Sequence, residues 1–311
     1  MRGLVIKTTG NSYTVQPRDG GAAIAAYVKG NFRIRGIRST NPVAVGDYVA
    51  VEQQSDGTNW ITDIEERRNY IIRRSTNLSK QTHILAANVD QAVLIVTVAH
   101  PVTSLTFIDR FLATAEAYRV PAVLIFNKTD ILTKAEKNTL AEWQSLYEQL
   151  GYTTFALSAT HLDPSDLLPL FEGKVSLLSG NSGVGKSTLL NALLGKEITR
   201  TAELSAMHDS GMHTTTFSEM YPIEDGNVRG GYIIDTPGIK GFGGVAMEKT
   251  EVSHYFREIF RVGQRCRYSD CLHFGEKDCA VVPSVAKGEI AMSRYESYLS
   301  LLGDCEEAKY R

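Results

Sequence analysis

The segment Gly180–Ser187 constrains this 311-residue chain more than any other, because it fits the pattern Gly-x-x-x-x-Gly-Lys-Ser. It follows the apolar run Lys174–Leu178 and precedes the helical pattern Thr188–Leu194, which is the context that a phosphate-binding loop requires. Its glycines let backbone N–H groups turn toward phosphate oxygens, and the positive end of the helix dipole adds to the attraction. We therefore predict a parallel α/β sheet with a phosphate site at the carboxyl end of one strand.

The residues of this loop have separate expected roles. Lys186 is expected to contact the β- and γ-phosphates, and the hydroxyl of Ser187 is expected to ligate Mg²⁺. The predicted phosphate-binding residues are Gly180, Asn181, Ser182, Gly183, Val184, Gly185, Lys186, Ser187 and Thr188.

A second motif, Asn127-Lys128-Thr129-Asp130, follows the apolar run Ala122–Phe126 and identifies the base. A carboxylate at Asp130 accepts hydrogen bonds from the N1 and N2 hydrogens of guanine, and adenine cannot donate both. Asn127 and Lys128 are predicted to bind the same nucleotide, with the lysine stem on the base plane. Ser158 and Ala159 follow the predicted strand Thr153–Leu157, so they belong to the same edge of the sheet.

A third motif, Asp235-Thr236-Pro237-Gly238, ends the predicted strand Gly231–Ile234. A carboxylate at this place can hold the hydration shell of Mg²⁺, and the N–H of Gly238 is expected to reach the γ-phosphate. The pattern Asp-x-x-Gly is common by chance, so its position after a strand carries the prediction.

The order of these motifs along the chain is unusual. The base motif comes first, then Ser158-Ala159, then the phosphate loop, and Asp235–Gly238 comes last. This order predicts a circularly permuted guanine-nucleotide domain, with the remaining segments attached where the permutation opens the fold.

The first 75 residues read as a separate all-β part. Short β-prone runs alternate with Gly, Asn and Asp turn signals, which indicates a barrel of about five strands, such as an OB-fold. This part has 11 Lys and Arg against 7 Asp and Glu, although the whole chain carries −2. The basic residues fit a phosphate-contacting surface, and a solvated face explains them equally well.

The residues beyond Phe242 read as a helical part with a cysteine and histidine cluster. Three thiolates and one imidazole within fourteen residues form a complete tetrahedral ligand set for a structural Zn²⁺. The predicted ligands are Cys266, Cys271, His273 and Cys279. Unrelated reduced cysteines are the alternative. Four arginines (Arg257, Arg261, Arg265 and Arg267) flank the cluster, where they face RNA or form surface ion pairs.

Composition places the chain among cytoplasmic proteins. Hydrophobic residues make up 43% and charged residues 22% of it. The sequence has no apolar run of membrane-spanning length and no signal-peptide pattern at its start.

The motif order, with Gly211–Thr216 between the phosphate loop and Asp235, resembles the circularly permuted GTPases. More narrowly, the chain is similar to the bacterial ribosome small-subunit-dependent GTPase A family (RsgA type). The likeness extends from the barrel through Ala86–Gln91 to the cysteine cluster. It implies a GTPase that binds the small ribosomal subunit and its rRNA late in subunit assembly, with one zinc ion and Mg²⁺ with GTP.

Hydrolysis raises a separate question, because Ile239 follows Gly238 where Ras-like GTPases have a water-orienting glutamine. An apolar side chain cannot orient water, so His213 in Gly211–Thr216 is the candidate catalytic residue. The resemblance implies the same role, and a solvated or partner-binding histidine is the alternative. Among the neighbouring threonines, Thr215 is our predicted magnesium ligand.

The predicted architecture has an OB-fold-like barrel at 1–74, a circularly permuted P-loop G domain at 75–241 and a helical zinc-binding domain at 242–311. We expect a monomer that acts as a subunit-stimulated GTP hydrolase. A nucleotide-gated RNA-binding module with incidental hydrolysis is the alternative. A small-molecule kinase fits poorly, because a kinase has no use for the base motif.

Overall fold

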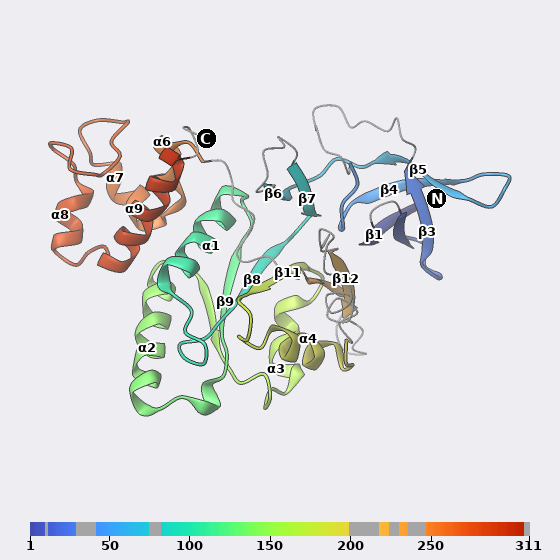
Figure 1. The fold of residues 1–311 in the computed structure, drawn as a ribbon, viewed down its shortest axis with the longest axis horizontal. Helices are drawn as coiled ribbons and strands as arrows, with labels where there is room; N and C mark the ends of the chain where they lie inside the picture. Colours follow the sequence, from blue (N-terminus) through green and yellow to red (C-terminus); the bar gives the residue numbers. More distant parts are fainter. Residues whose placement is uncertain are drawn as a thin grey trace, which may run out of the picture.

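A computed structural model of the chain describes residues 1–9, 12–28, 42–74, 82–198, 218–223, 230–235 and 247–307. Its three parts are a β-barrel, an α/β sheet and a bundle of short helices, which lie at the right, centre and left of Figure 1. This division confirms the predicted fold class.

The first part is a closed five-stranded barrel. Its strands are β1 (Arg2–Thr8), β2 (Ser12–Pro17), β3 (Ile24–Val28), β4 (Tyr48–Gln53) and β5 (Asn59–Ile64). They are hydrogen-bonded in the order β1-β2-β3-β5-β4, and β1 also pairs with β4 to close the barrel. The β3–β5 pair is parallel. Alternate apolar residues such as Val5, Val15, Val49 and Ile61 fill the interior, as a small barrel requires.

The central sheet carries the predicted motifs. Its order is β10-β9-β8-β11-β13-β12, and β12 pairs antiparallel with β13 while the other strands are parallel. The strands are β8 (Gln91–Val96), β9 (Ala122–Phe126), β10 (Thr153–Ala156), β11 (Val175–Gly180), β12 (Glu219–Ile223) and β13 (Gly231–Asp235). The carboxyl ends of the five parallel strands therefore meet at one edge, where open α/β sheets bind ligands.

Helices cover both faces of this sheet. They are α1 (Leu105–Ala117), α2 (Lys134–Gln149), α3 (Pro164–Phe171) and α4 (Lys186–Leu194). Ala92, Leu94 and Val96 of β8 share a core with α1 and α2, whereas Val93 and Ile95 share one with α3 and α4. This alternation explains why β8 reads as a continuous apolar run.

The third part packs three short helices, one long helix and the cysteine cluster around its own small core. The helices are α6 (Lys249–Val252), α7 (Arg257–Gly263), α8 (Val281–Ala286) and α9 (Met292–Glu307), with 3₁₀ turn η2 (Ser253–Tyr255) between α6 and α7. Phe256, Ile259, Val281 and Tyr298 are fully buried in this core. We call residues 247–307 the C-terminal module.

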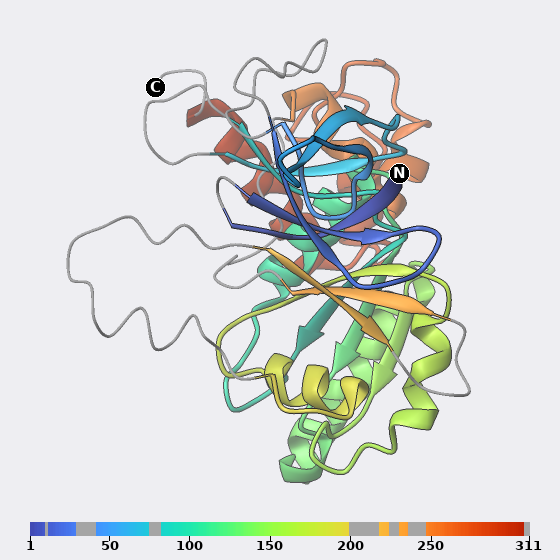
Figure 2. The same cartoon turned by 90° about the vertical axis from the view of Figure 1, so that its right-hand side faces the viewer.

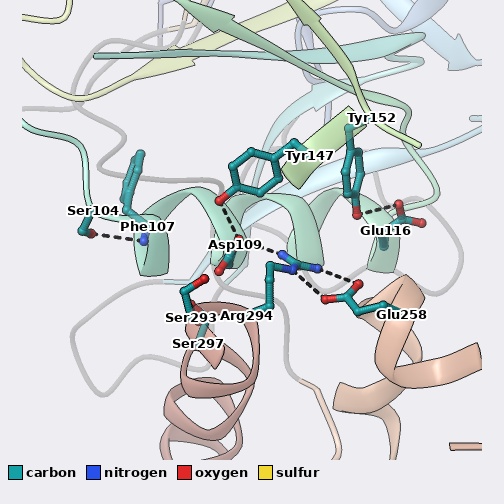
Figure 3. Close-up of polar contacts among 10 residues, drawn as sticks. All are labelled: Ser104, Phe107, Asp109, Glu116, Tyr147, Tyr152, Glu258, Ser293, Arg294 and Ser297. Carbon is teal, nitrogen blue, oxygen red and sulfur yellow. Dashed lines mark hydrogen bonds and ion pairs between the residues drawn. The ribbon is translucent and has the colours of Figure 1, made fainter. Parts of the chain in front are cut away.

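The C-terminal module is docked on α1 through buried charges (Figure 3). Arg294 of α9 donates to Asp109 of α1 at 2.7 Å and to both carboxylate oxygens of Glu258 in α7 at 2.7 and 3.2 Å. The hydroxyl of Tyr147 in α2 donates to the same Asp109 oxygen at 2.8 Å. Arg294 and Asp109 are at most 1% exposed. A second arginine of the module, Arg257, pairs with Glu116 of α1. We call the central sheet with its helices the sheet domain.

The barrel is attached differently, through backbone pairing. A hairpin of β6 (Tyr70–Arg74) and β7 (Thr82–Ala87) leads from the barrel into the sheet. Gly46 lies against β7 so closely that an added Cβ would come within 2.1 Å of the carbonyl oxygen of Ala87. Strand β1 also pairs with β12, at Lys7 and Glu219, so the barrel strands continue the central sheet (Figure 2).

Among the described residues, no helix combines the length and apolar character needed to cross a membrane.

Candidate nucleotide and metal sites

The phosphate loop lies between β11 and α4, as predicted. Gly185 begins the helix with a φ of +94°, and an added Cβ would come within 2.3 Å of the Asn127 side-chain nitrogen. Only glycine fits both the left-handed backbone and this contact. No side chain caps the first turn of α4, so Lys186, Ser187 and Thr188 begin a helix end suited to an anion.

The side chain of Asn127 connects three predicted motifs. Its amide nitrogen donates to the carbonyl oxygen of Val184 in the phosphate loop at 2.8 Å. Its amide oxygen accepts from the N–H of Ala159 at 2.8 Å. Because Asn127 is only 3% exposed, both bonds are shielded from water, and an unmade bond there would be costly. Asn127 therefore holds the base motif, the Ser158-Ala159 turn and the phosphate loop in one frame.

Asp130 lies exposed in the 3₁₀ turn Thr129–Ile131, directly after Lys128. A hydrogen bond from the Ser158 hydroxyl lowers the pKa of Asp130, and the positive charge of Lys128 acts in the same direction. The carboxylate is therefore ionised near neutral pH and able to accept two hydrogen bonds from a base edge. Lys128 has a φ of +65° and donates to the carbonyl oxygen of His100 at 2.6 Å.

His161 is a neighbour of this carboxylate that the sequence reading missed. Its Nδ1 lies 3.2 Å from the Ser158 hydroxyl, 3.1 Å from that of Thr160 and 3.9 Å from Asp130. Its position two residues after Ala159 was the signal in the sequence that could have placed it near Asp130.

Lys186 and Asp235 form an ion pair between the phosphate loop and the end of β13. Their side chains are 12% and 17% exposed. The Ser187 hydroxyl and the Asp235 carboxylate are hard oxygen donors, the kind of ligand that Mg²⁺ prefers. The remaining predicted residues of this site, His213, Thr215 and Gly238, lie outside the described residues.

The four predicted metal ligands come together in the C-terminal module. The ligand atoms of Cys266, Cys271, His273 and Cys279 all lie within 4.8 Å of one another. Nδ1 of His273 is 3.5 Å from the Cys266 sulfur and 3.7 Å from that of Cys279. Tetrahedral zinc, with its usual bond lengths, separates a sulfur and a nitrogen ligand by roughly 3.6 Å. The donor set therefore fits Zn²⁺ in both chemistry and spacing.

Hydrogen bonds around the cluster fix its loops. The hydroxyl of Tyr295 donates to the carbonyl oxygen of His273 at 2.7 Å, and that of Tyr298 donates to Leu272 at 2.5 Å. Glu276 accepts from the N–H groups of Leu272 and Phe274. Burial lowers the pKa of His273, which favours the neutral imidazole that a metal requires.

The arginines near the cluster mostly pair within the chain. Arg257 binds Glu116 of α1 at 2.7 Å and donates to the carbonyl oxygens of Leu150 and Gly151. Arg267 lies 3.1 Å from Asp278, and Arg265 is within 3.8 Å of Glu289. The ion-pair alternative therefore describes these three arginines better than an RNA-facing row.

Comparison with known proteins places this geometry in one family. The family model described as RsgA GTPase matches residues 64–244, and the RsgA N-terminal domain model matches residues 2–61. A protein of Phocaeicola vulgatus named "Small ribosomal subunit biogenesis GTPase RsgA" is 56% identical, over all of this chain and 99% of its own length. A protein of Bacteroides fragilis with the same name is 55% identical over the same shares.

Solved structures agree with this placement. YjeQ from Thermotoga maritima superposes with a TM-score of 0.75 at 32% identity, covering 98% of both chains. YloQ, described as a circularly permuted GTPase, gives a TM-score of 0.72 at 26% identity, covering all of this chain and 96% of its own. The permuted order predicted from the motifs is therefore found in a similar protein of known structure.

Proposed function

The chain belongs to the RsgA GTPase family, and we propose that it binds the small ribosomal subunit late in its assembly and hydrolyses GTP there. The names of its relatives support the small ribosomal subunit as the partner. The two hydrogen bonds of Asn127 are the observation that best supports a guanine nucleotide as the ligand. One buried hydrogen bond ties the motif that contains Asp130 to the phosphate loop, and a second ties it to the Ser158-Ala159 turn.

The proposed nucleotide site keeps every predicted position. The residues that bind GTP are Asn127, Lys128, Asp130, Ser158, Ala159, Gly180, Asn181, Ser182, Gly183, Val184, Gly185, Lys186, Ser187, Thr188, Asp235 and Gly238. Asp130 reads the base edge, and Lys186 leaves Asp235 to bind the β- and γ-phosphates. Ser187, Thr215 and the water shell at Asp235 would hold Mg²⁺, which would neutralise charge on the phosphates.

His213 is the proposed catalytic residue, because Ile239 cannot orient the attacking water. His213→Ala should lower GTP turnover at least tenfold and leave GTP affinity nearly unchanged. Both quantities can be measured with the purified chain, and unchanged turnover would remove His213 from the mechanism.

Zn²⁺ is the proposed metal of the C-terminal module, with a structural role. Cys266, Cys271, His273 and Cys279 would occupy all four tetrahedral positions of the ion and leave none for substrate. We further propose a cytoplasmic monomer with domain boundaries after residues 74 and 241.

The decisive experiment is GTP turnover with and without purified small subunits. The proposed function requires stimulation by the subunit and little hydrolysis of ATP. Binding without stimulation would favour the alternative, a nucleotide-gated RNA-binding module. Turnover of ATP at the rate of GTP would contradict both.

A further inference from the structure

A row of charged side chains crosses three strands between the barrel and the phosphate loop. Lys7 of β1 is in register with Glu219 of β12, and Glu219 is in register with Asp235 of β13. Asp235 in turn pairs with Lys186 of the phosphate loop. The row therefore alternates from lysine to two carboxylates and back to lysine.

The side chains of this row point to the same face of the sheet. Residues directly opposite in antiparallel strands share a face, with Cβ atoms roughly 5 Å apart. Nζ of Lys7 lies 3.0 Å from Oε1 of Glu219, and the hydroxyl of Tyr221 donates to Oε2 of Glu219 at 3.0 Å. Burial is the main cause that raises the pKa of Tyr221, and the negative charges of Glu219 and Asp235 raise it further. Both carboxylates therefore lie close to the Tyr221 hydroxyl.

Two carboxylates opposite each other repel unless cations flank them. Here Lys186 flanks Asp235, and the barrel supplies the other cation, Lys7. A nucleotide changes this balance because the proposed site requires Lys186 to turn to phosphate. Glu219 then depends on Lys7 and the Tyr221 hydroxyl for compensation.

We propose that Lys7 is a positioning residue of the nucleotide site, contributed by the barrel, which neutralises Glu219 so that Asp235 and Lys186 can serve the nucleotide. The proposal rests on the phosphate site described above. Two strand spacings, roughly 10 Å, separate Lys7 from Asp235, which is about one Debye length at 0.1 M salt, so the effect is strongest at low ionic strength. The barrel therefore influences nucleotide affinity through charge as well as through its backbone pairing.

The test compares nucleotide affinity with and without magnesium. Lys7→Met leaves Glu219 as an unneutralised negative charge, which repels the diphosphate. We expect GDP affinity in the presence of EDTA to fall about threefold to tenfold. With saturating Mg²⁺, which cancels much of the phosphate charge, the loss should shrink below about twofold. The pair is half-exposed at 40% and 35%, so the variant should fold normally.

Two further variants make the test specific. Arg2→Met removes the same charge from the same strand, but Arg2 pairs with Glu65 at 3.4 Å; GDP affinity should not change. The double variant Lys7→Met with Glu219→Gln removes both charges and should restore wild-type affinity within about twofold.

The proposal fails if Lys7→Met behaves like Arg2→Met. It also fails if the loss is equal with and without magnesium, or if Glu219→Gln does not rescue it, because a purely structural defect gives those results. Lys186→Ala tests the phosphate site itself: undiminished GDP affinity in that variant would refute the site rather than the role of Lys7.

Discussion

The barrel and the C-terminal module are joined to the same sheet domain by opposite physical means. The module docks on α1 with Arg294 and Asp109 almost completely removed from water. The barrel joins β12 by backbone pairing and by one half-exposed ion pair. Buried ionic contacts are costly to break singly, whereas half-exposed ones are weak. We therefore expect the module to move as one body with α1, and the barrel to respond more readily to changes in the sheet.

The difference also gives each part its own connection to the proposed nucleotide site. Strand β12 pairs with β13, whose last residue is Asp235, so the barrel reaches the phosphate side of the site. Helix α1 begins after the loop containing His100 and Pro101, and Pro101 lies 3.6 Å from where a Cβ on Gly183 would be. The module therefore reaches the same site through α1, independently of the chain segment after Asp235.

Removal of the metal should produce the largest difference in stability between the C-terminal module and the barrel. Structural zinc contributes roughly 10 kcal/mol or more to the folding of small zinc-binding modules, so a chelator under reducing conditions should unfold residues 257–302. Hydrogen exchange measured by mass spectrometry should rise in α7 and α8 and stay unchanged in β1 and β4. Equal protection of α7 with and without metal would show that the module folds without it.

Substitution of the buried arginine should have the next largest effect. Arg294→Met leaves the carboxylates of Asp109 and Glu258 buried without a cation, which costs about 3–5 kcal/mol. The free energy of unfolding of the module, measured in urea, should fall by that amount. The triple variant Arg294→Met, Asp109→Leu, Glu258→Leu should recover most of it, and a triple variant as unstable as the single one would contradict this explanation.

The barrel junction can be weakened at Gly46. Gly46→Ala introduces a Cβ against the Ala87 carbonyl at a φ of +92°, so we expect a loss of about 2–3 kcal/mol. Gly57→Ala is the matched control, because Gly57 has a φ of +85° and no atom near an added Cβ. Trp60 fluorescence in a Trp143→Phe background reports the barrel alone. Equal losses in the two variants would mean that the close contact contributes nothing.

The smallest effect is expected at the rim of the module interface. Arg110 of α1 pairs with Asp304 at 2.6 Å, but the two side chains are 36% and 57% exposed. Arg110→Met should therefore change the free energy of unfolding by less than about 1 kcal/mol. A loss as large as that of Arg294→Met would remove the proposed distinction between buried and exposed pairs.

The sequence predicted local features well. The strand Ala122–Phe126 is confirmed to the residue. Every residue in it is apolar, and residues that do not favour strands flank it on both sides. The apolar run Val93–Ala99 predicts a strand over those residues, but the strand is Gln91–Val96. Its polar first residue is buried because Gln91 donates to the Ser176 hydroxyl and the Leu170 carbonyl, partners about 80 positions away in sequence. Local hydrophobicity cannot reveal such pairing.

Contacts between residues distant in sequence also explain why the ion pairs at the two interfaces were not predicted. Arg294 lies in an amphipathic helix, where a lone arginine normally faces solvent, and its partners are 36 and 185 residues away. The row from Lys7 to Asp235 depends on strand register between distant segments. The position of the phosphate-loop segment before α4 and the clustering of the three cysteines with His273 were predictable, because each set is continuous or nearly so in the chain.

The hydrogen bonds of Asn127 have a consequence for how this domain can be rearranged. The Asn127 amide holds its own loop to two others, the phosphate loop and the Ser158-Ala159 turn. These contacts do not depend on the order of the three loops in the sequence. New termini can therefore be placed in any connection that leaves these three loops intact. A redesigned gene encoding the segments in the common GTPase order should still assemble the pocket, and the positions where the barrel and module are fused could then be chosen freely.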